Sequence, residues 1–216
     1  VGDDGGIYES FDNAENWHYF ENLSLTQFYK VAVDDAEPFY NIYGGTQDNG
    51  SLGGLSRTDN VHGVQTQDWR MILGWDGQQP ATEPGNPDIV YAERQEGMLS
   101  RIDVITGEVI DIQPQPGADE NLERFNWDAP ILVSPHDPAR LYFASQRLWR
   151  SDNRGDKWLA ISDDLTRNQE RMNLPVMGRL QSWDSPWDLV SMSNYNTITP
   201  ISESPRVEIG RAHVGN

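Results

Sequence analysis

Two short turns combine the residue types that a ligand-binding surface uses. Asp48 lies in the segment GGTQDNG, and Trp75 and Asp76 lie in the segment GWDGQ. Glycine near an acid is typical of a tight turn, which presents the carboxylate for hydrogen bonding or acid–base chemistry. A tryptophan ring offers a flat face on which a sugar ring can stack. Asp48, Trp75 and Asp76 are therefore candidate ligand contacts, although both acids can instead stabilise their own turns.

Two further tryptophans are candidates for ligand stacking. Trp183 and Trp187 lie in a polar segment that predicts an exposed loop. Amphipathic aromatic side chains are enriched at recognition surfaces, so both are predicted to contact a ligand. Trp127, in contrast, follows a more apolar pattern, and we expect it in the core.

The sequence predicts no metal or cofactor site. It has no cysteine, which excludes disulfides, thiolate metal ligands and a cysteine nucleophile. His18 and His62 have no second histidine at metal-ligand spacing. His136 lies between Pro135 and Asp137, in a predicted turn. The acidic loops lack the spacing of a calcium-binding EF loop.

Two segments predict the same kind of tight hairpin turn. SDNRGDKW (residues 151–158) and SFDNAENW (residues 10–17) both resemble the Asp-box, S-x-D-x-G-x-x-W, of bacterial-neuraminidase repeats. Ser and Asx side chains bond turn amides, glycine supplies positive φ, and we expect the tryptophan to fold back over the turn. These residues are predicted to be structural rather than catalytic: Ser10, Asp12, Trp17, Ser151, Asn153, Gly155 and Trp158.

A repeat of about fifty residues sets the predicted fold. Tyr43, Tyr91 and Tyr142 lie in similar strand-like segments, 48 and 51 residues apart. This period is typical of a β-propeller, in which each blade is a four-stranded sheet. We predict an all-β propeller fragment of about four antiparallel blades, at residues 1–25, 26–75, 76–127 and 128–206, incomplete at both ends. The polar, Gly-rich residues 51–67 and the segment from Gly74 to Gly77 are expected to be loops.

Composition limits the possible partners. The net charge of −18 argues against nucleic acid, whose phosphates require clustered Lys and Arg. No apolar run approaches the roughly 20 residues that span a membrane. The 19 glycines and 13 prolines favour many short strands joined by turns.

Three segments together resemble a known protein family. YGGTQDNG (residues 43–50), RFNWDAPILVSPHDP (residues 124–138) and RSDNRGDKW (residues 150–158) are similar to secreted bacterial glycosyl-hydrolase-like, or sortilin-like, propeller proteins. Their relatives include two-propeller xyloglucan-cleaving hydrolases. In these an Asp-x-Gly-Gly-x-Tyr segment carries a catalytic aspartate, which the resemblance places at Asp3 in DDGGIY. The resemblance also implies an extracellular or periplasmic location.

Two functions remain open on these residues. The favoured one is a recognition module that binds a polysaccharide, peptide or protein through axial loops, because every strong motif is structural. The alternative is an endo-acting glycoside hydrolase, in which two carboxyl groups flank the scissile bond. Asp3 or Asp76 would supply one of them, and the partner carboxylate of that architecture comes from a second propeller.

The last ten residues are predicted to be non-native. EIGRAHV (residues 208–214) matches one reading frame of a common sequencing-library adapter and follows a broken repeat. Amplifying the locus again and reading across codon 206 tests this prediction. We expect a different sequence from about residue 207; an uninterrupted EIGRAHV would contradict the prediction.

Overall fold

The chain folds almost entirely into short antiparallel strands. The structure is a computed structural model that describes residues 1–3, 5–21, 23, 25–186, 194–207 and 210–214. The described residues contain no α-helix, only three short 3-10 turns: η1 (Thr66–Asp68), η2 (Gln95–Gly97) and η3 (Arg171–Asn173). None of these residues forms a helix that is long and apolar enough to cross a membrane. The predicted all-β class is confirmed.

Three four-stranded sheets form the body of the molecule, and in each of them strand order follows the chain. The first comprises β4 (Val31–Val33), β5 (Asn41–Thr46), β6 (Gly50–Leu55) and β7 (Trp69–Leu73). The second comprises β8 (Gly77–Glu83), β9 (Asn86–Arg94), β10 (Met98–Asp103) and β11 (Val109–Asp111). The third comprises β12 (Ile131–Val133), β13 (Leu141–Ala144), β14 (Leu148–Ser151) and β15 (Leu159–Ala160).

Smaller sheets flank this body. A three-stranded sheet precedes it, made of β1 (Gly2–Asp3), β2 (Gly6–Glu9) and β3 (His18–Tyr19). Two strand pairs follow it: β16 (Pro175–Val176) with β17 (Arg179–Leu180), and β18 (Ile198–Glu203) with β19 (Gly210–Val214). The strand β19 falls within the residues predicted to be non-native, and its pairing does not bear on their origin.

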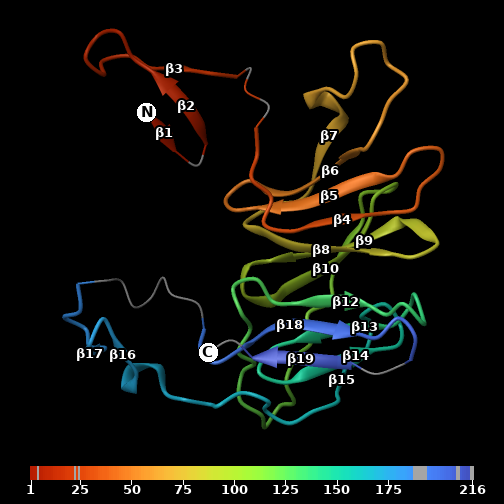
Figure 1. The fold of residues 1–216 in the computed structure, drawn as a ribbon, viewed down its shortest axis with the longest axis vertical. Coiled ribbons are helices and arrows are strands. Elements are labelled where there is room, and N and C mark those ends of the chain that lie inside the picture. Colours follow the sequence, from red (N-terminus) through yellow and green to blue (C-terminus); the bar gives the residue numbers. More distant parts are fainter. Residues whose placement is uncertain (4, 22, 24, 187–193, 208–209, 215–216) are drawn as a thin grey trace.

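The sheets stack side by side through their first strands (Figure 1). β8 contacts both β4 and β12, and β12 contacts β18. One buried apolar cluster, including Tyr43, Val90 and Ile102, joins the first four-stranded sheet to the second. Another, including Leu99 and Phe143, joins the second to the third. This is the architecture of a β-propeller fragment, and the described sheets do not close into a ring.

The three aligned tyrosines occupy one register position. Tyr43 pairs with Ala32, Tyr91 with Ala81, and Tyr142 with Leu132, each on the first strand of its own sheet. The hydroxyl of Tyr91 donates to Glu83, two residues beyond its paired alanine, and that of Tyr43 donates to Asp34 in the same way. The repeat inferred from spacing is therefore also a structural repeat.

One segment expected to be a loop is partly a strand. Gly50–Leu55 forms β6, because the Tyr43 ring fills the place of a side chain at Gly53 and the Trp69 ring does so at Gly54. Residues 74–76 form a loop, as expected, and β8 begins at Gly77. Local composition misled at β6, since tertiary packing supplies the burial that the segment itself does not suggest.

Close backbone contact between neighbouring sheets predicts that Gly45→Ala destabilises the fold. A Cβ at Gly45 would lie 2.0 Å from the carbonyl oxygen of Gln78, which is backbone of the next sheet. The two sheets must separate to admit it, so we expect a loss of about 1–3 kcal/mol in unfolding free energy, measured by urea denaturation. Gly74→Ala is the control, because a Cβ there meets nothing within 4 Å. Equal unfolding midpoints for the two variants would contradict the prediction.

Candidate functional site

Strand direction gathers most of the candidate residues at one end of the sheets. Because the strands alternate in direction, the turns β5–β6, β9–β10 and β13–β14 lie at the end where β4, β8 and β12 begin. The β1–β2 turn lies beside the β5–β6 turn, since both line one cleft. The connections β7–β8 and β11–β12 cross the same end, and the connection from β15 to β18 starts and finishes there. We call this end the loop face; it lies toward the left of the sheets in Figure 1.

Asp48 and Asp76 meet on the loop face. The backbone N–H of Asp48, in the β5–β6 turn, donates to Oδ1 of Asp76 at 2.6 Å. Asp48 has a φ of 61°, a left-handed conformation that aspartate tolerates better than most residues. The Asp76 carboxylate thus holds a turn from the neighbouring sheet, and the Asp48 side chain is exposed.

Trp75 is both exposed and held in an unfavourable backbone conformation. Its φ is 74°, and 68% of its surface is accessible. For a bulky residue the left-handed region costs about 1–2 kcal/mol, and such outliers cluster at ligand sites. The strain supports a role for the indole ring that an unstrained turn residue would not serve.

Asp3 lines a cleft beside the three-stranded sheet of β1, β2 and β3. Its Oδ1 accepts the backbone N–H groups of Gly5 at 2.8 Å and Gly6 at 3.1 Å. The cleft, of about 640 Å³, also contacts Gln47 and Asn49, the two neighbours of Asp48. The three-stranded sheet and the β5–β6 turn therefore line the same cleft. One carboxylate oxygen of Asp3 is engaged by backbone amides of its own turn.

Trp183 is more exposed than Trp75. It lies in a turn closed by the hydrogen bond from Ser185 N to Ser182 O, and 86% of its surface is accessible. Met177 and Leu180, on the preceding β16–β17 hairpin, are exposed as well. Trp187 lies outside the described residues.

Side-chain ion pairs that the sequence analysis missed hold the long β11–β12 connection in place. Arg147, in the β13–β14 turn, contacts Glu120 and Glu123 at 2.6 Å each. Arg124 contacts Asp164 at 2.7 Å. A hydrogen bond from Arg147 lowers the pKa of Glu120 to about 2. The acid-rich composition of this loop, with arginines within and after it, was the available signal.

A second group that the sequence analysis missed lies where three sheets converge. Lys30 Nζ lies 2.8 Å from Asp128 Oδ2 and 3.1 Å from Gln79 Oε1, which joins residues just before β4 and β12 to β8. Beside them, Glu93 is fully buried on β9. Its Oε1 accepts the N–H groups of Gly97 at 3.0 Å and Ala129 at 2.9 Å. Burial raises the pKa of Glu93 well above its ordinary value.

The repeat itself held a signal for Glu93. It lies two residues after Tyr91, and the matching positions after Tyr43 and Tyr142 are Gly45 and Ala144. An acid at a position that is otherwise small and buried is unusual. In the described part of the chain, no three His, Asp or Glu side chains gather so as to hold a metal ion.

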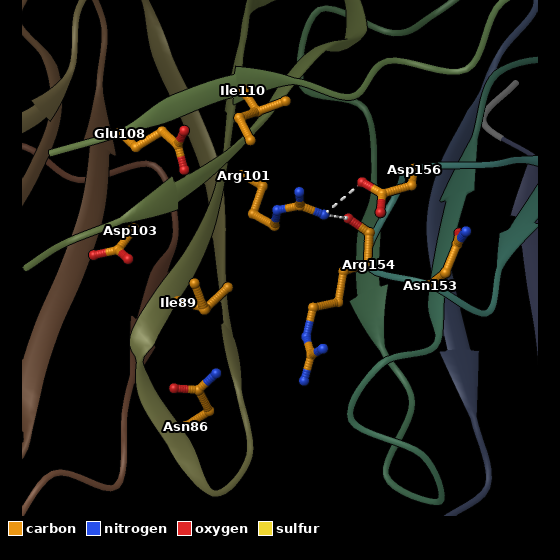
Figure 2. Close-up of a pocket in the computed structure, with 9 residues that line it drawn as sticks. All are labelled: Asn86, Ile89, Arg101, Asp103, Glu108, Ile110, Asn153, Arg154 and Asp156. Carbon is orange, nitrogen blue, oxygen red and sulfur yellow. Dashed lines mark hydrogen bonds and ion pairs between the residues drawn. The ribbon is translucent and has the colours of Figure 1, made fainter. Parts of the chain in front are cut away.

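A hollow of about 480 Å³ lies at the opposite end of the sheets from the loop face (Figure 2). Arg101 crosses it to donate to Asp156 at 2.9 Å and to the carbonyl oxygen of Arg154 at 2.7 Å. The Arg154 side chain leaves the β14–β15 turn and donates twice to Glu83, at 2.8 and 2.7 Å. The arginines here are committed to joining the second four-stranded sheet to the third.

The two Asp-box-like turns make the same hydrogen bonds. Ser151 Oγ accepts Gly155 N, and Asn153 Oδ1 accepts Lys157 N, both at 2.9 Å. In the other turn Ser10 Oγ accepts Ala14 N, and Asp12 Oδ1 accepts Asn16 N, both also at 2.9 Å. Hydrogen bonds from Asn16 lower the pKa of Asp12 to about 2.

The Trp158 side chain was expected to fold over its own turn, but it points toward the preceding sheet. Its indole N–H donates to the carbonyl oxygen of Ile112, at the end of the preceding sheet, at 2.6 Å. The ring also packs near Phe143 in its own sheet, with ring centroids 6.3 Å apart. The tryptophan therefore joins neighbouring sheets rather than closing over its own turn.

Comparison with known proteins gives little beyond architecture. No protein-family model matches the chain. No curated protein sequence matches it either. Among solved structures it is similar to the GH74 xyloglucanase from Xanthomonas campestris, with a TM-score of 0.45 and 14% sequence identity. The similarity covers 82% of this chain and 25% of that one, so the chain spans about a quarter of the xyloglucanase. A similarity of this size does not identify an activity.

The joint at Glu83 predicts a large effect of Arg154→Ala. Glu83 is 2% exposed, so removing Arg154 leaves a buried carboxylate without its main partner, and we expect a loss of about 1–3 kcal/mol in unfolding free energy at neutral pH. Arg150→Ala is the matched control, because Arg150 pairs with the exposed Asp152 and such surface pairs contribute about 0–1 kcal/mol.

The same comparison has a pH dependence. Burial is the largest single influence and raises the pKa of Glu83, but hydrogen bonds from Arg154, Asn86 and Tyr91, together with the charge of Arg154, outweigh it and leave the pKa below its ordinary value of 4.5. A lowered carboxyl pKa contributes stability above the unfolded value, and that stability is lost as pH falls through the folded value. The gap between wild type and Arg154→Ala should therefore shrink below pH 4.5. A gap that is constant across this range would contradict the assignment.

Proposed function

We propose that the chain is part of a secreted β-propeller recognition module that binds a polysaccharide, peptide or protein through its loop face. The observation that carries this proposal is the contrast between its carboxylates and its tryptophans. The candidate acids have oxygens engaged in holding turns, whereas Trp75 and Trp183 present their rings to solvent. Binding by stacking requires only the rings.

The carboxylates support binding over catalysis. Asp76 Oδ1 accepts a backbone N–H from the β5–β6 turn, and Asp3 Oδ1 accepts two N–H groups in its own turn. An acid–base pair for glycoside hydrolysis instead needs two carboxyl groups that face each other across the substrate. The bonds made by Asp3 and Asp76 are those of structural acceptors.

The tryptophans support a ligand with flat apolar faces, such as a sugar chain. Trp75 combines exposure with a costly backbone conformation, so the fold expends free energy to hold the ring where it is. Large aromatic side chains are the usual anchors of binding surfaces. Among the three ligand classes, a polysaccharide is the first to test.

The ion-paired β11–β12 connection supports a preformed surface. Arg147 fixes it to the β13–β14 turn through Glu120 and Glu123, and its guanidinium lies 4.5 Å above the Trp149 ring. A loop that is ordered before binding loses less conformational entropy on binding. We assign the two Asp-box-like turns a structural role.

The alternative is a glycoside hydrolase that uses Asp3. It is favoured by one observation, that Asp3 lines the cleft shared with Gln47 and Asn49. Only Oδ1 of Asp3 is engaged by the turn amides, so the other oxygen could take part in proton transfer. Asp76 is the other residue that could supply this carboxylate, and the partner carboxylate would come from a second propeller.

Affinity electrophoresis through gels containing xyloglucan or β-glucans tests the binding proposal. We expect retardation of the wild-type chain, and a dissociation constant at least about fivefold higher for Trp75→Ala or Trp183→Ala, because loss of an aromatic anchor costs more than about 1 kcal/mol. Phe11→Ala is the control: Phe11 is 87% exposed and lies in the β2–β3 turn, at the other end of its sheet from the β1–β2 turn.

Reducing-sugar release from the same polysaccharides separates the two functions. Release by the wild-type chain that is lost in Asp3→Asn would support the hydrolase. Retardation without release, weakened by the tryptophan changes, would support the recognition module. Equal retardation of wild type and both tryptophan variants would contradict a role for these rings in polysaccharide binding.

A further inference from the structure

Glu93 joins two segments of the loop face that belong to different sheets. Its Oε1 accepts the N–H of Gly97, in the β9–β10 turn of its own sheet, and the N–H of Ala129, just before β12 of the next sheet. A third bond runs beside these, from Glu96 N to Trp127 O at 3.2 Å. One carboxyl oxygen thus anchors both sides of the joint.

The packing leaves little room for this joint to adjust. Gly97 has a φ of 79°, and the Phe125 ring lies where its Cβ would be, only 2.3 Å away. Phe125 belongs to the buried cluster between the second and third four-stranded sheets. The position of Glu93 is therefore set by a rigid surrounding and not by its own flexibility.

Two buried carboxyl oxygens in this joint have no hydrogen-bond donor among the described residues. They are Oε2 of Glu93 and Oδ1 of Asp128, the residue directly before Ala129. An ionised Glu93 would leave the charged oxygen Oε2 buried without a hydrogen-bond donor and subject to the like charge of Asp128, which is unfavourable. A proton on Glu93 removes this charge, because a protonated carboxyl is neutral.

We propose that Glu93 is protonated in the folded chain, and that loss of this proton to solvent at higher pH loosens the joint between the β9–β10 turn and the start of β12. Glu93 is thus a positioning residue for the loop face, and its charge state decides how tightly two neighbouring loops are held together. The proposal does not depend on the nature of the ligand.

The charged groups around Glu93 define the direction of each effect. Asp128, before β12, opposes its ionisation, and Lys30, before β4, favours it. Burial acts in the same direction as Asp128 and is the larger influence, so the pKa of Glu93 is raised. The raised value means that the folded joint is most stable when Glu93 is protonated and loses stability as pH rises through the folded pKa.

Amide NMR of the whole chain tests the proposal. The shifts of the Gly97 and Ala129 amides should titrate together, with a midpoint well above 4.5, and their protection from hydrogen exchange should fall as the pH passes that midpoint. Glu93→Gln should abolish both effects, because glutamine keeps the Oε1 acceptor but does not ionise. Glu108→Gln, at an exposed acid on the opposite end of the sheets, is the control.

Two charge changes give shifts of opposite sign. Asp128→Asn should lower the midpoint, since it removes a like charge, and Lys30→Met should raise it, since it removes an opposite charge. These variants decide the matter even if Glu93→Gln fails to fold. A titration midpoint at or below 4.5, or shifts of the same sign in both variants, would overturn the proposal.

Discussion

A four-stranded blade cannot bury both of its faces alone, so the fold depends on how closely neighbouring sheets approach. At Gly45 the approach is backbone to backbone, against Gln78 of the next sheet. At the opposite end of the sheets it is ionic, through Arg154 and the buried Glu83. On the loop face it is a buried carboxyl, Glu93, that bonds to Ala129. Each joint uses different chemistry for the same geometric requirement.

The two ends of the sheets have different tasks. At the end away from the loop face, arginine side chains and the Trp158 indole are engaged in inter-sheet contacts, which fix the stacking. On the loop face the connections are longer, and they leave aromatic rings such as Trp75 exposed. Propellers commonly combine a rigid scaffold of sheets with variable loops at one end, and ligand recognition uses those loops.

Spacing and turn chemistry predicted much of this fold, and side-chain environment limited the rest. The tyrosine period gave the repeat, and the Ser and Asx spacing predicted the turns that Ser10 and Ser151 organise. The Gly-rich strand β6 was missed, because its burial comes from the distant rings of Tyr43 and Trp69. Glu93 was not predicted as a joint between sheets, since the joint depends on its hydrogen bond with Ala129, which is remote in sequence.

The turns around Ser10 and Ser151 have one more consequence, which concerns how such a chain can change over time. The hydrogen bonds that their Ser and Asx side chains accept from turn amides are internal, so a duplicated or exchanged repeat carries these bonds with it. The contacts between sheets differ, because Arg154 pairs with Glu83 of the preceding repeat and needs an acid at that position. Recombination between repeats would therefore preserve hairpins but mismatch neighbours, and selection on those matched pairs would keep the repeats in a fixed order.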